Sequence, residues 1–155
     1  MPPLTLEQIQ AEHQRLGALI AELQVSAETA QPQTYVIPEA SIELGPGERY
    51  AGLVLDDAGA PLHHLVLLPG EADGVTWDAA KTWADLGPGE LPTRQEQALL
   101  YANLKGAFQP EWYWSSEEHA SDGSYAWGQG FVNGGQYSDR KSYEGRARAV
   151  RRFPA

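Results

Sequence analysis

The chain contains no cysteine among its 155 residues. Disulfide bonds, a thiolate nucleophile, cysteine-ligated zinc and iron–sulfur clusters are therefore excluded. Small secreted domains often depend on disulfides because their hydrophobic cores are small. This chain must instead be stabilised by its core, by oligomerisation, or by both.

Long apolar runs are also missing. No stretch approaches the roughly 18 uninterrupted apolar residues that a membrane-spanning helix needs. The first residues, MPPLTLEQIQ, lack the basic region and apolar run of a secretory signal. We expect no signal peptide, no transmembrane segment and no membrane insertion. The protein is predicted to be cytoplasmic when made, or to be assembled into a particle such as a virion.

Basic residues are few. Eleven Lys and Arg residues stand against 21 Asp and Glu residues, which gives a formal charge of −10 and a pI of about 4.7. Such a chain repels polyanions at long range, so nucleic acid is not expected as a partner. Six of the eleven basic residues lie after position 139: Arg140, Lys141, Arg146, Arg148, Arg151 and Arg152.

These C-terminal arginines have two interpretations. Arg146, Arg148 and Arg152 are expected to alternate along one terminal strand, where an exposed row could contact an acidic partner. The interpretation that we favour is structural. The arginines would pair with the surplus carboxylates of their own domain and stack on its Trp and Tyr rings.

Aromatic and turn-forming residues are well represented. The chain has five Trp, seven Tyr and three Phe, with 16 Gly and 11 Pro. The aromatic content is enough for the core of one domain of this size. The Gly and Pro content predicts many turns between short elements.

Residues 5–25 have the pattern of an amphipathic helix. Thr5 can cap its N-terminus, and Gln8 completes a capping box. Apolar residues and one His then recur at spacings of three and four, which makes a heptad seam of nearly three repeats. The seam consists of Leu6, Ile9, His13, Leu16, Ile20 and Leu23. A helix packed on its own domain and a short oligomerising coiled coil both need this seam, so both interpretations stay open.

We divide the chain into an N-terminal helix at 1–30, a linker at 31–47 and a domain at 48–155. The domain is predicted to begin with strands, followed by two helices that Thr76 and Thr93 cap. From Trp112 onward, short strands alternate with Gly-rich loops. The expected strands are 50–55, 63–68, 112–115, 125–127, 131–132 and 146–152. Strands, then two helices, then more strands predict an α+β domain.

Adjacent histidines in the second strand were considered as metal ligands. His63 and His64 should point to opposite faces of the sheet, so a shared metal is not expected. Their apolar surroundings indicate one half-buried and one exposed histidine, with structural roles.

Two groups of residues resemble a known family. In the first group, residues 75–81 (VTWDAAK) lead through a Gly turn to residues 89–96 (GELPTRQE). The second group is a later run that contains Tyr113-Trp114-Ser115-Ser116, residues 125–127, Gly134 and residues 146–151. This pattern resembles the formylglycine-generating-enzyme-like branch of the C-type lectin fold. It is most similar to C-terminal domains of bacterial and phage proteins, some of them variable targets of diversity-generating retroelements and some tail-associated receptor binders. The resemblance covers about residues 48–153.

The resemblance implies a C-type-lectin-like fold, with two helices packed on short antiparallel strands and long Gly-rich loops, here preceded by the N-terminal amphipathic helix. It also implies that the ligand-facing surface comes from about residues 117–143. The ligand-binding residues expected there are Glu117, His119, Asp122, Ser124, Tyr125, Gly128, Gly130, Val132, Asn133, Tyr137, Ser138, Asp139 and Arg140. Tyr gives large contact area at low entropic cost, and Ser, Gly and Asn give adaptable hydrogen bonds. The alternative is an ordinary solvated Gly-rich loop.

The chain departs from the catalytic and calcium-binding members of that fold. Without cysteine, the copper-dependent oxidation of the formylglycine-generating enzymes is excluded. Gln109-Pro110-Glu111 is only superficially similar to the sugar-binding triplet of calcium lectins, because it precedes the Trp114 strand. Glu117, Glu118 and Asp122 are the nearest calcium candidates, with solvated carboxylates as the default interpretation.

We therefore expect a non-enzymatic ligand- or receptor-binding protein, encoded by a phage or prophage, with no cofactor, no metal and no catalytic residues. Its partner would be a protein or glycan on a cell or particle surface. A homo-oligomer formed through the N-terminal helix would raise the avidity of weak sites. The alternative function is a structural or assembly component of a phage particle without an exchangeable ligand.

Overall fold

The computed structural model describes residues 3–30 and 32–155. The chain separates into two compact units, residues 1–36 and 37–155. Residues 1, 2 and 31, which fall in the predicted helical segment and linker, lie outside the described residues. The second unit begins inside the segment that was predicted as a linker.

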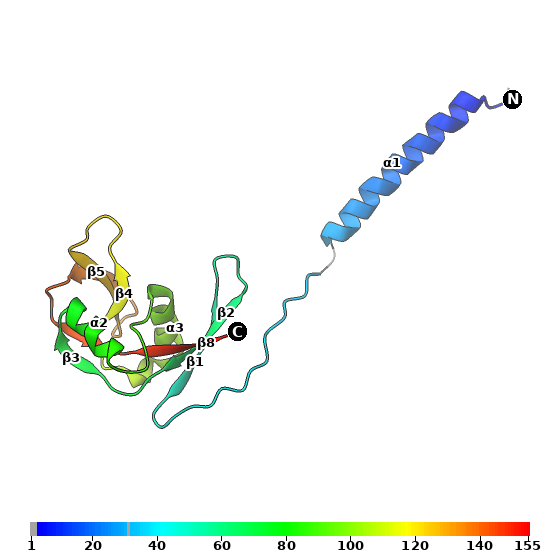
Figure 1. Cartoon of the computed structure of the whole chain (residues 1–155). Coiled ribbons are helices and arrows are strands. Elements are labelled where there is room, and N and C mark those ends of the chain that lie inside the picture. Colours follow the sequence, from blue (N-terminus) through cyan, green and yellow to red (C-terminus); the bar gives the residue numbers. More distant parts are fainter. Residues whose placement is uncertain (1–2, 31) are drawn as a thin grey trace. The chain divides into compact units, whose positions relative to one another are not determined.

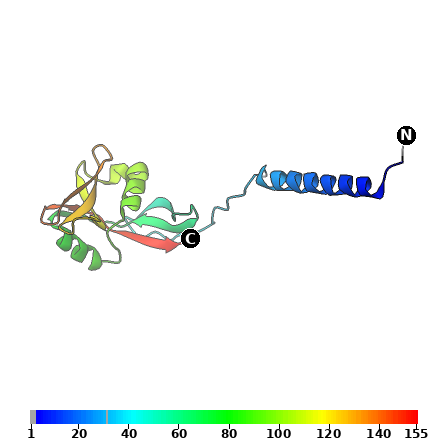
Figure 2. The ribbon, with the colours of Figure 1, turned by 90° about the horizontal axis from the view of Figure 1, so that it is seen from above.

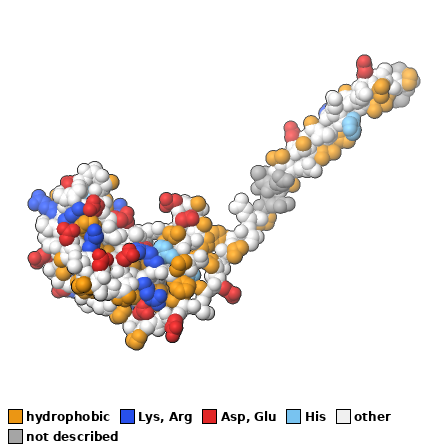
Figure 3. All heavy atoms as spheres, viewed as in Figure 1, with side chains coloured by type: hydrophobic (Ala, Val, Ile, Leu, Met, Phe, Trp, Pro, Cys, Tyr) orange, Lys and Arg blue, Asp and Glu red, His pale blue; other side chains and the backbone are white. Residues whose placement is uncertain are grey.

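The first unit is dominated by one helix, α1 (Leu6–Ala30). It begins at the predicted capping box, where the Gln8 N–H donates to Thr5 Oγ1 (3.2 Å) and the Thr5 N–H donates to Gln8 Oε1 (3.0 Å). The five apolar seam residues are each 49–71% exposed. Figure 3 shows hydrophobic side chains along the length of this helix. The seam is thus uncovered within its own unit.

The second unit is an α+β domain with two sheets in the described part of the chain (Figure 1). The smaller sheet has the order β1 (Arg49–Leu55), β2 (Pro61–Leu67), β8 (Val150–Pro154). The larger has the order β3 (Ala72–Val75), β7 (Gly145–Ala147), β4 (Trp112–Glu118), β5 (Tyr125–Gly130), β6 (Gln136–Arg140). The pairings are antiparallel except for the parallel contact of β4 with β7. The helices are α2 (Trp77–Asp85) and α3 (Arg94–Leu104), with a 3-10 turn at Lys105–Ala107.

Both domain helices begin at the predicted caps. Thr76 accepts a hydrogen bond from the Ala79 N–H. At α3 the capping box is complete, because Thr93 Oγ1 accepts from the Glu96 N–H (3.2 Å) and Glu96 Oε1 accepts from the Thr93 N–H (2.9 Å). These short side-chain bonds satisfy N–H groups that a helix leaves unpaired at its start.

The two helices cover opposite faces of the larger sheet, as Figure 2 shows. Tyr113 and Trp114 are neighbours in β4, so their side chains point to opposite faces. Trp114 packs with Trp77, Ala80 and Ala84 of α2 in one core cluster. Tyr113 packs with Leu100 and Leu104 of α3 in the other. The sheet therefore separates two cores, and each face is defined by the helix that covers it.

Two predicted strands are wrong. Phe131–Val132 lies in a turn, and the run 146–152 is divided between β7 and β8 of different sheets. Because the chain crosses between the sheets at Arg148, the arginines form no alternating row on one strand. Arg148 is instead held inside the crossing, where its guanidinium donates to the carbonyls of Ala107 (2.7 Å) and Leu68 (2.8 Å).

The ion-pairing part of the favoured structural interpretation is confirmed for the other arginines of β7 and β8. The expected stacking on Trp and Tyr rings is not found for these arginines within the described residues. Arg146 pairs with Glu71 (2.8 Å), Arg151 with Glu48 (2.6 Å) and Arg152 with Glu96 (2.8 Å). Arg151 also donates to the Glu43 carbonyl (2.9 Å). It therefore holds part of the predicted linker against the domain.

The histidine prediction is partly wrong. His63 and His64 do have separate partners, since His63 Nε2 is 2.8 Å from Glu96 Oε2 and His64 Nδ1 is 2.8 Å from the Tyr50 hydroxyl. Neither side chain is exposed, however: His64 is buried and the His63 side chain is 14% exposed. The prediction of one exposed histidine is wrong because it considered only the apolar neighbours. Glu96 binds His63, and Tyr50 binds His64.

Glu96 is the most buried carboxylate in this network, with 1% of its surface exposed. Arg152 donates to both of its oxygens at 2.8 Å, and its ring partner is His63 of β2. Burial alone would raise the pKa of Glu96, but the hydrogen bonds from Arg152, Thr93 and His63 hold that pKa below its ordinary value. The ionised carboxylate thus joins α3 to β2 and β8.

None of the helices in the described chain combines the length and apolar character that crossing a bilayer requires.

Replacing Arg152 with Met should lower the free energy of unfolding by about 3 kcal/mol at pH 7, because it leaves a buried charge without its main partner. Urea unfolding measures the loss. Since the folded-state pKa of Glu96 is lowered, its stabilisation is present above the unfolded pKa and disappears as the pH falls through the folded value. The difference between variant and wild type should therefore shrink in acid. An equal loss in the exposed control Arg140→Met would contradict this account.

Candidate functional site

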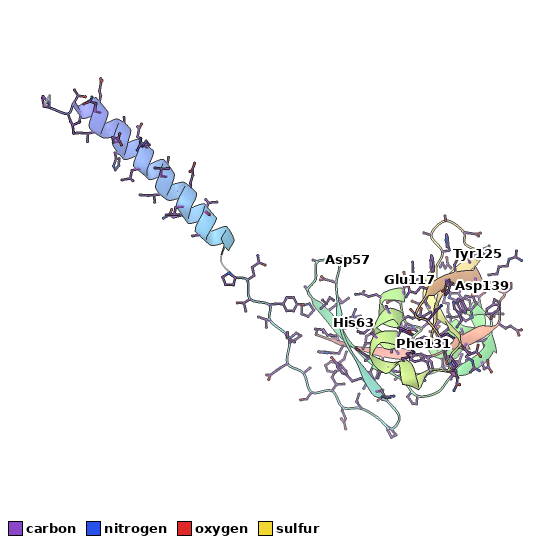
Figure 4. All side chains as sticks on the ribbon, turned by 180° about the vertical axis from the view of Figure 1, so that it is seen from behind. Asp57, His63, Glu117, Tyr125, Phe131 and Asp139 are labelled. Carbon is purple, nitrogen blue, oxygen red and sulfur yellow. The ribbon has the colours of Figure 1, made fainter. Side chains whose placement is uncertain are left out.

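The predicted site residues lie on and around the β5–β6 hairpin, but they do not form one surface. Tyr125 pairs with Arg140, Trp127 with Ser138 and Gln129 with Gln136, so these six side chains share one face. Ala126 pairs with Asp139 and Gly128 with Tyr137 on the other face. Figure 4 shows Tyr125, Asp139 and Glu117 at the same end of the domain, away from His63 in β2 and Asp57 in the β1–β2 turn.

On the α3 side of the sheet, the side chains form a continuous stacked surface. Trp127 is its centre: the His119 ring lies nearly parallel to it at 5.4 Å (interplanar angle 15°), and the Arg94 guanidinium lies 3.7 Å from its ring centroid. The Tyr125 hydroxyl is 3.4 Å from Arg140 Nε. We call this surface the Trp127 face; it consists of Arg94, His119, Tyr125, Trp127, Ser138 and Arg140.

The α2 side carries Tyr137 and Asp139. Tyr137 is exposed, and its hydroxyl is 3.4 Å from Asn133 Nδ2, so it leans on the turn that precedes β6. Val132 is exposed in the same turn. Residues of this side are therefore separated from the Trp127 face by the thickness of the sheet.

Gly128 and Gly130 are buried in β5 and present no side chain to a ligand. A Cβ at Gly128 would collide with the Trp112 ring and would lie 2.6 Å from the Tyr113 carbonyl oxygen. The position is glycine because Trp112 packs directly on the backbone there. We therefore assign Gly128 to the packing of the sheet. Gly130 is buried too, although a Cβ there would meet only ordinary contacts, the nearest at 3.4 Å. Since both are buried, their predicted place in an exposed ligand surface is wrong.

A polar cavity of about 560 Å³ adjoins the Trp127 face at the start of α3. We call it the Arg94 cavity; it is lined by Thr93, Arg94, Gln95, Ala98, Glu117, Gln129, Gly134 and Gln136. Glu117 accepts a hydrogen bond from the Arg94 N–H (2.6 Å), so one predicted site residue lies in its wall. Its size is within the range of small-molecule sites, but its lining is unusually polar.

The three acidic calcium candidates have different partners. Glu117 binds the start of α3, Glu118 pairs with Lys141 (3.0 Å), and Asp122 accepts from the hydroxyl (2.6 Å) and N–H (3.0 Å) of Ser124. These bonds from Ser124 hold the pKa of Asp122 below its ordinary value. Within residues 3–30 and 32–155, no group of three or more His, Asp or Glu side chains is placed to hold a metal ion.

A second cavity, of about 620 Å³, is mostly apolar and lies beside the turn that follows α2. Trp83, Leu86 and Pro88 line one part of it, and Leu86 is 84% exposed. It shares no lining residue with the Arg94 cavity.

Sequence reasoning missed Arg94, Trp127 and Gln136. The sequence contains a signal for Trp127 and another for Arg94, but none for Gln136. Trp127 follows Tyr125 at the two-residue spacing of one strand face, and Arg94 is a cation at the first position of a helix, where the helix dipole disfavours positive charge. A residue that opposes the helix dipole is held there by other contacts, in this case by Glu117, Trp127 and Gln136.

No protein-family model matches the chain, and no curated protein matches it either.

Gly128→Ala should lower the free energy of unfolding by about 2 kcal/mol or more, because the added methyl group overpacks the Trp112 contact. Thermal or urea unfolding measures the loss. Gly123→Ala is the matched control, since a Cβ there meets no atom within 4 Å. If both variants were equally stable, Gly128 would be free to face a ligand as first predicted.

Proposed function

We propose that this protein is a non-enzymatic binding protein that presents the Trp127 face to a glycan or protein partner. We also propose that its domain is C-type-lectin-like, of the formylglycine-generating-enzyme-like branch, and that a phage or prophage encodes it. The observation that carries the binding function is the stack of His119, Trp127 and Arg94 beside Tyr125 and Arg140.

The composition of the Trp127 face supports recognition rather than catalysis. Tyr, Trp and Arg are the residues that contribute most to binding energy at interfaces. Here they are ordered before any partner arrives, because Arg94 and His119 are stacked on Trp127 and Arg140 lies against Tyr125. Ordered side chains lose less entropy on binding.

The family resemblance is supported by what its motif residues do. The Trp77 indole donates to the Ser115 carbonyl (2.8 Å), and the Trp114 indole donates to the Val75 carbonyl (2.9 Å). These two bonds fasten the first family-like segment to the second. Thr93, in the segment GELPTRQE, caps α3 and thereby positions Arg94.

Replacing Tyr125 and Arg140 together with Ala should weaken partner binding by about tenfold or more, because the variant removes one half-buried and one exposed side chain of the Trp127 face. The matched control, Tyr137→Ala with Asp139→Ala, changes the α2 side of the same hairpin and should retain binding. Binding of the full-length chain to a glycan array, and then to the glycan identified there, provides the measurement.

Loss of binding in the control, or full binding by the Tyr125/Arg140 variant, would place the ligand surface elsewhere. If the wild-type chain bound no glycan, the glycan partner would be wrong. That result would favour the alternative function, a structural component of a particle. The apolar cavity beside Leu86 would then be the surface that contacts another particle protein.

We further propose that α1 makes the protein a homo-oligomer. The seam places Leu6, His13 and Ile20 at one core position of successive heptads and Ile9, Leu16 and Leu23 at the other. The exposed apolar seam of α1 would be buried between copies. Several Trp127 faces in one assembly would then bind with greater avidity than one.

Leu16→Glu in the full-length chain should convert the oligomer to a monomer in sedimentation equilibrium, because it places a charge in the seam. Gln14→Glu adds the same charge outside the seam and should leave the oligomer intact. His13→Leu should strengthen association, since a polar residue at this position costs stability. A monomeric wild type would disprove the oligomer.

A further inference from the structure

We propose that the Arg94 cavity is a metal-independent subsite for a neutral sugar residue, which it recognises through two neighbouring hydroxyl groups. This inference rests on the proposed binding function and narrows the partner to a glycan.

Arg94 is held rigidly at the mouth of the cavity. Its Nε donates to Gln136 Oε1 (3.0 Å), and Gln136 Nε2 donates in return to the Arg94 carbonyl (2.7 Å). Gln136 Nε2 also donates to Oε1 of the buried Gln129 (3.0 Å), whose own amide donates to the Gly130 carbonyl (3.1 Å). With Trp127 beneath the guanidinium, a buried amide network fixes the orientation of Arg94.

These contacts use only one nitrogen of the guanidinium. In the described residues, the hydrogen bonds of the Arg94 side chain involve Nε, and neither Nη atom has a hydrogen-bond partner. The Nη groups are donors only. Glu117 is an acceptor only, and its Oε2 is 2.6 Å from the Arg94 backbone nitrogen. Both residues line the cavity, which therefore offers donors from Arg94 and an acceptor from Glu117.

This pairing selects a class of ligand. A hydroxyl group both donates and accepts, so two neighbouring hydroxyls can bind Arg94 and Glu117 at once. A carboxylate or phosphate ligand has only acceptors and would meet the like charge of Glu117 in a domain whose chain carries a net charge of −10. An ammonium ligand would meet Arg94. A neutral polyol satisfies both groups.

The remaining wall fits the same ligand. Gln95 also lines the cavity, and its amide nitrogen binds the Leu55 carbonyl (2.9 Å), which holds this side chain in place. Gly134, which also lines the cavity, must be glycine: its φ is +80°, and a Cβ there would lie 2.6 Å from the Tyr101 ring. A volume of about 560 Å³ is ample for one sugar ring.

The test is a titration of the full-length protein followed by NMR at the indole N–H of Trp127, which lies under Arg94. The neutral probes are the methyl glycosides of glucose, galactose and mannose. Tetrahydropyran-2-methanol has a similar ring without the neighbouring hydroxyls, and glucuronate adds a carboxylate. At least one methyl glycoside should shift the Trp127 signal, in the presence of EDTA as well, while tetrahydropyran-2-methanol should not. Glucuronate should bind more weakly than methyl glucoside.

Arg94→Met and Glu117→Gln should each weaken glycoside binding by about tenfold, the effect of losing one hydrogen bond to a charged group. Arg94→Lys keeps the charge without the planar fork and should not restore full affinity. Unchanged thermal midpoints show that these variants still fold. Arg49→Met removes an exposed arginine of β1 that belongs to neither the Arg94 cavity nor the Trp127 face, and this variant should bind the glycosides like the wild type.

Three results would overturn the subsite: no glycoside shifts the Trp127 signal, glycosides bind the Arg94→Met variant equally well, or glucuronate binds more tightly than methyl glucoside. The proposed function is judged separately by array binding and the Tyr125/Arg140 variant. Array binding that depends on Tyr125 and Arg140 but not on Arg94 would leave the Trp127 face in place and remove only the sugar subsite.

Discussion

The ionised carboxylate of Glu96 is the constraint on which the arrangement of the domain depends. It completes the capping box of α3, pairs with His63 in β2 and binds Arg152 in β8. One buried charge thus fixes the start of the helix against the smaller sheet. Since the same helix start carries Arg94, the position of the candidate site follows from the position of Glu96. A buried ion pair is costly to desolvate, so its value here is in orientation more than in net stability.

The starts of the helices could be predicted from the sequence because helix capping depends on residues that are close together in the chain. Each cap joins the hydroxyl of Thr5, Thr76 or Thr93 to a backbone N–H three residues later, and the structure contains all three. The strands fared worse. β3 and β6 went unpredicted because they are short and polar, and the crossing at Arg148 was invisible because it depends on carbonyls of residues distant in sequence. The assignment to a C-type-lectin-like fold remains a proposal.

The candidate site could be predicted only in outline. Residues 117–143 do contain the exposed hairpin, but sequence order cannot show which residues share a face without the pairing register. The β5–β6 register places Tyr125 and Tyr137 on opposite faces of the sheet, although the sequence predicts both in one ligand surface. Arg94 comes from a different element, and only the fold brings it onto Trp127. Conversely, Gly128 looked adaptable in the sequence and proves to be fixed by Trp112.

The position of β7 has a consequence for the synthesis of the protein. This short strand lies between β3 and β4, and the strand after it, β8, brings the partners of Glu48 and Glu96. Until residues 145–152 leave the ribosome, β3 lacks its partner strand β7, and one edge of β4 is open beside Trp112 and Trp114. Glu48, Glu71 and Glu96 also lack their arginines. An open strand edge next to exposed tryptophans favours aggregation. The domain therefore cannot complete its fold before residues 145–152 have emerged, and the growing chain is most prone to aggregation until then.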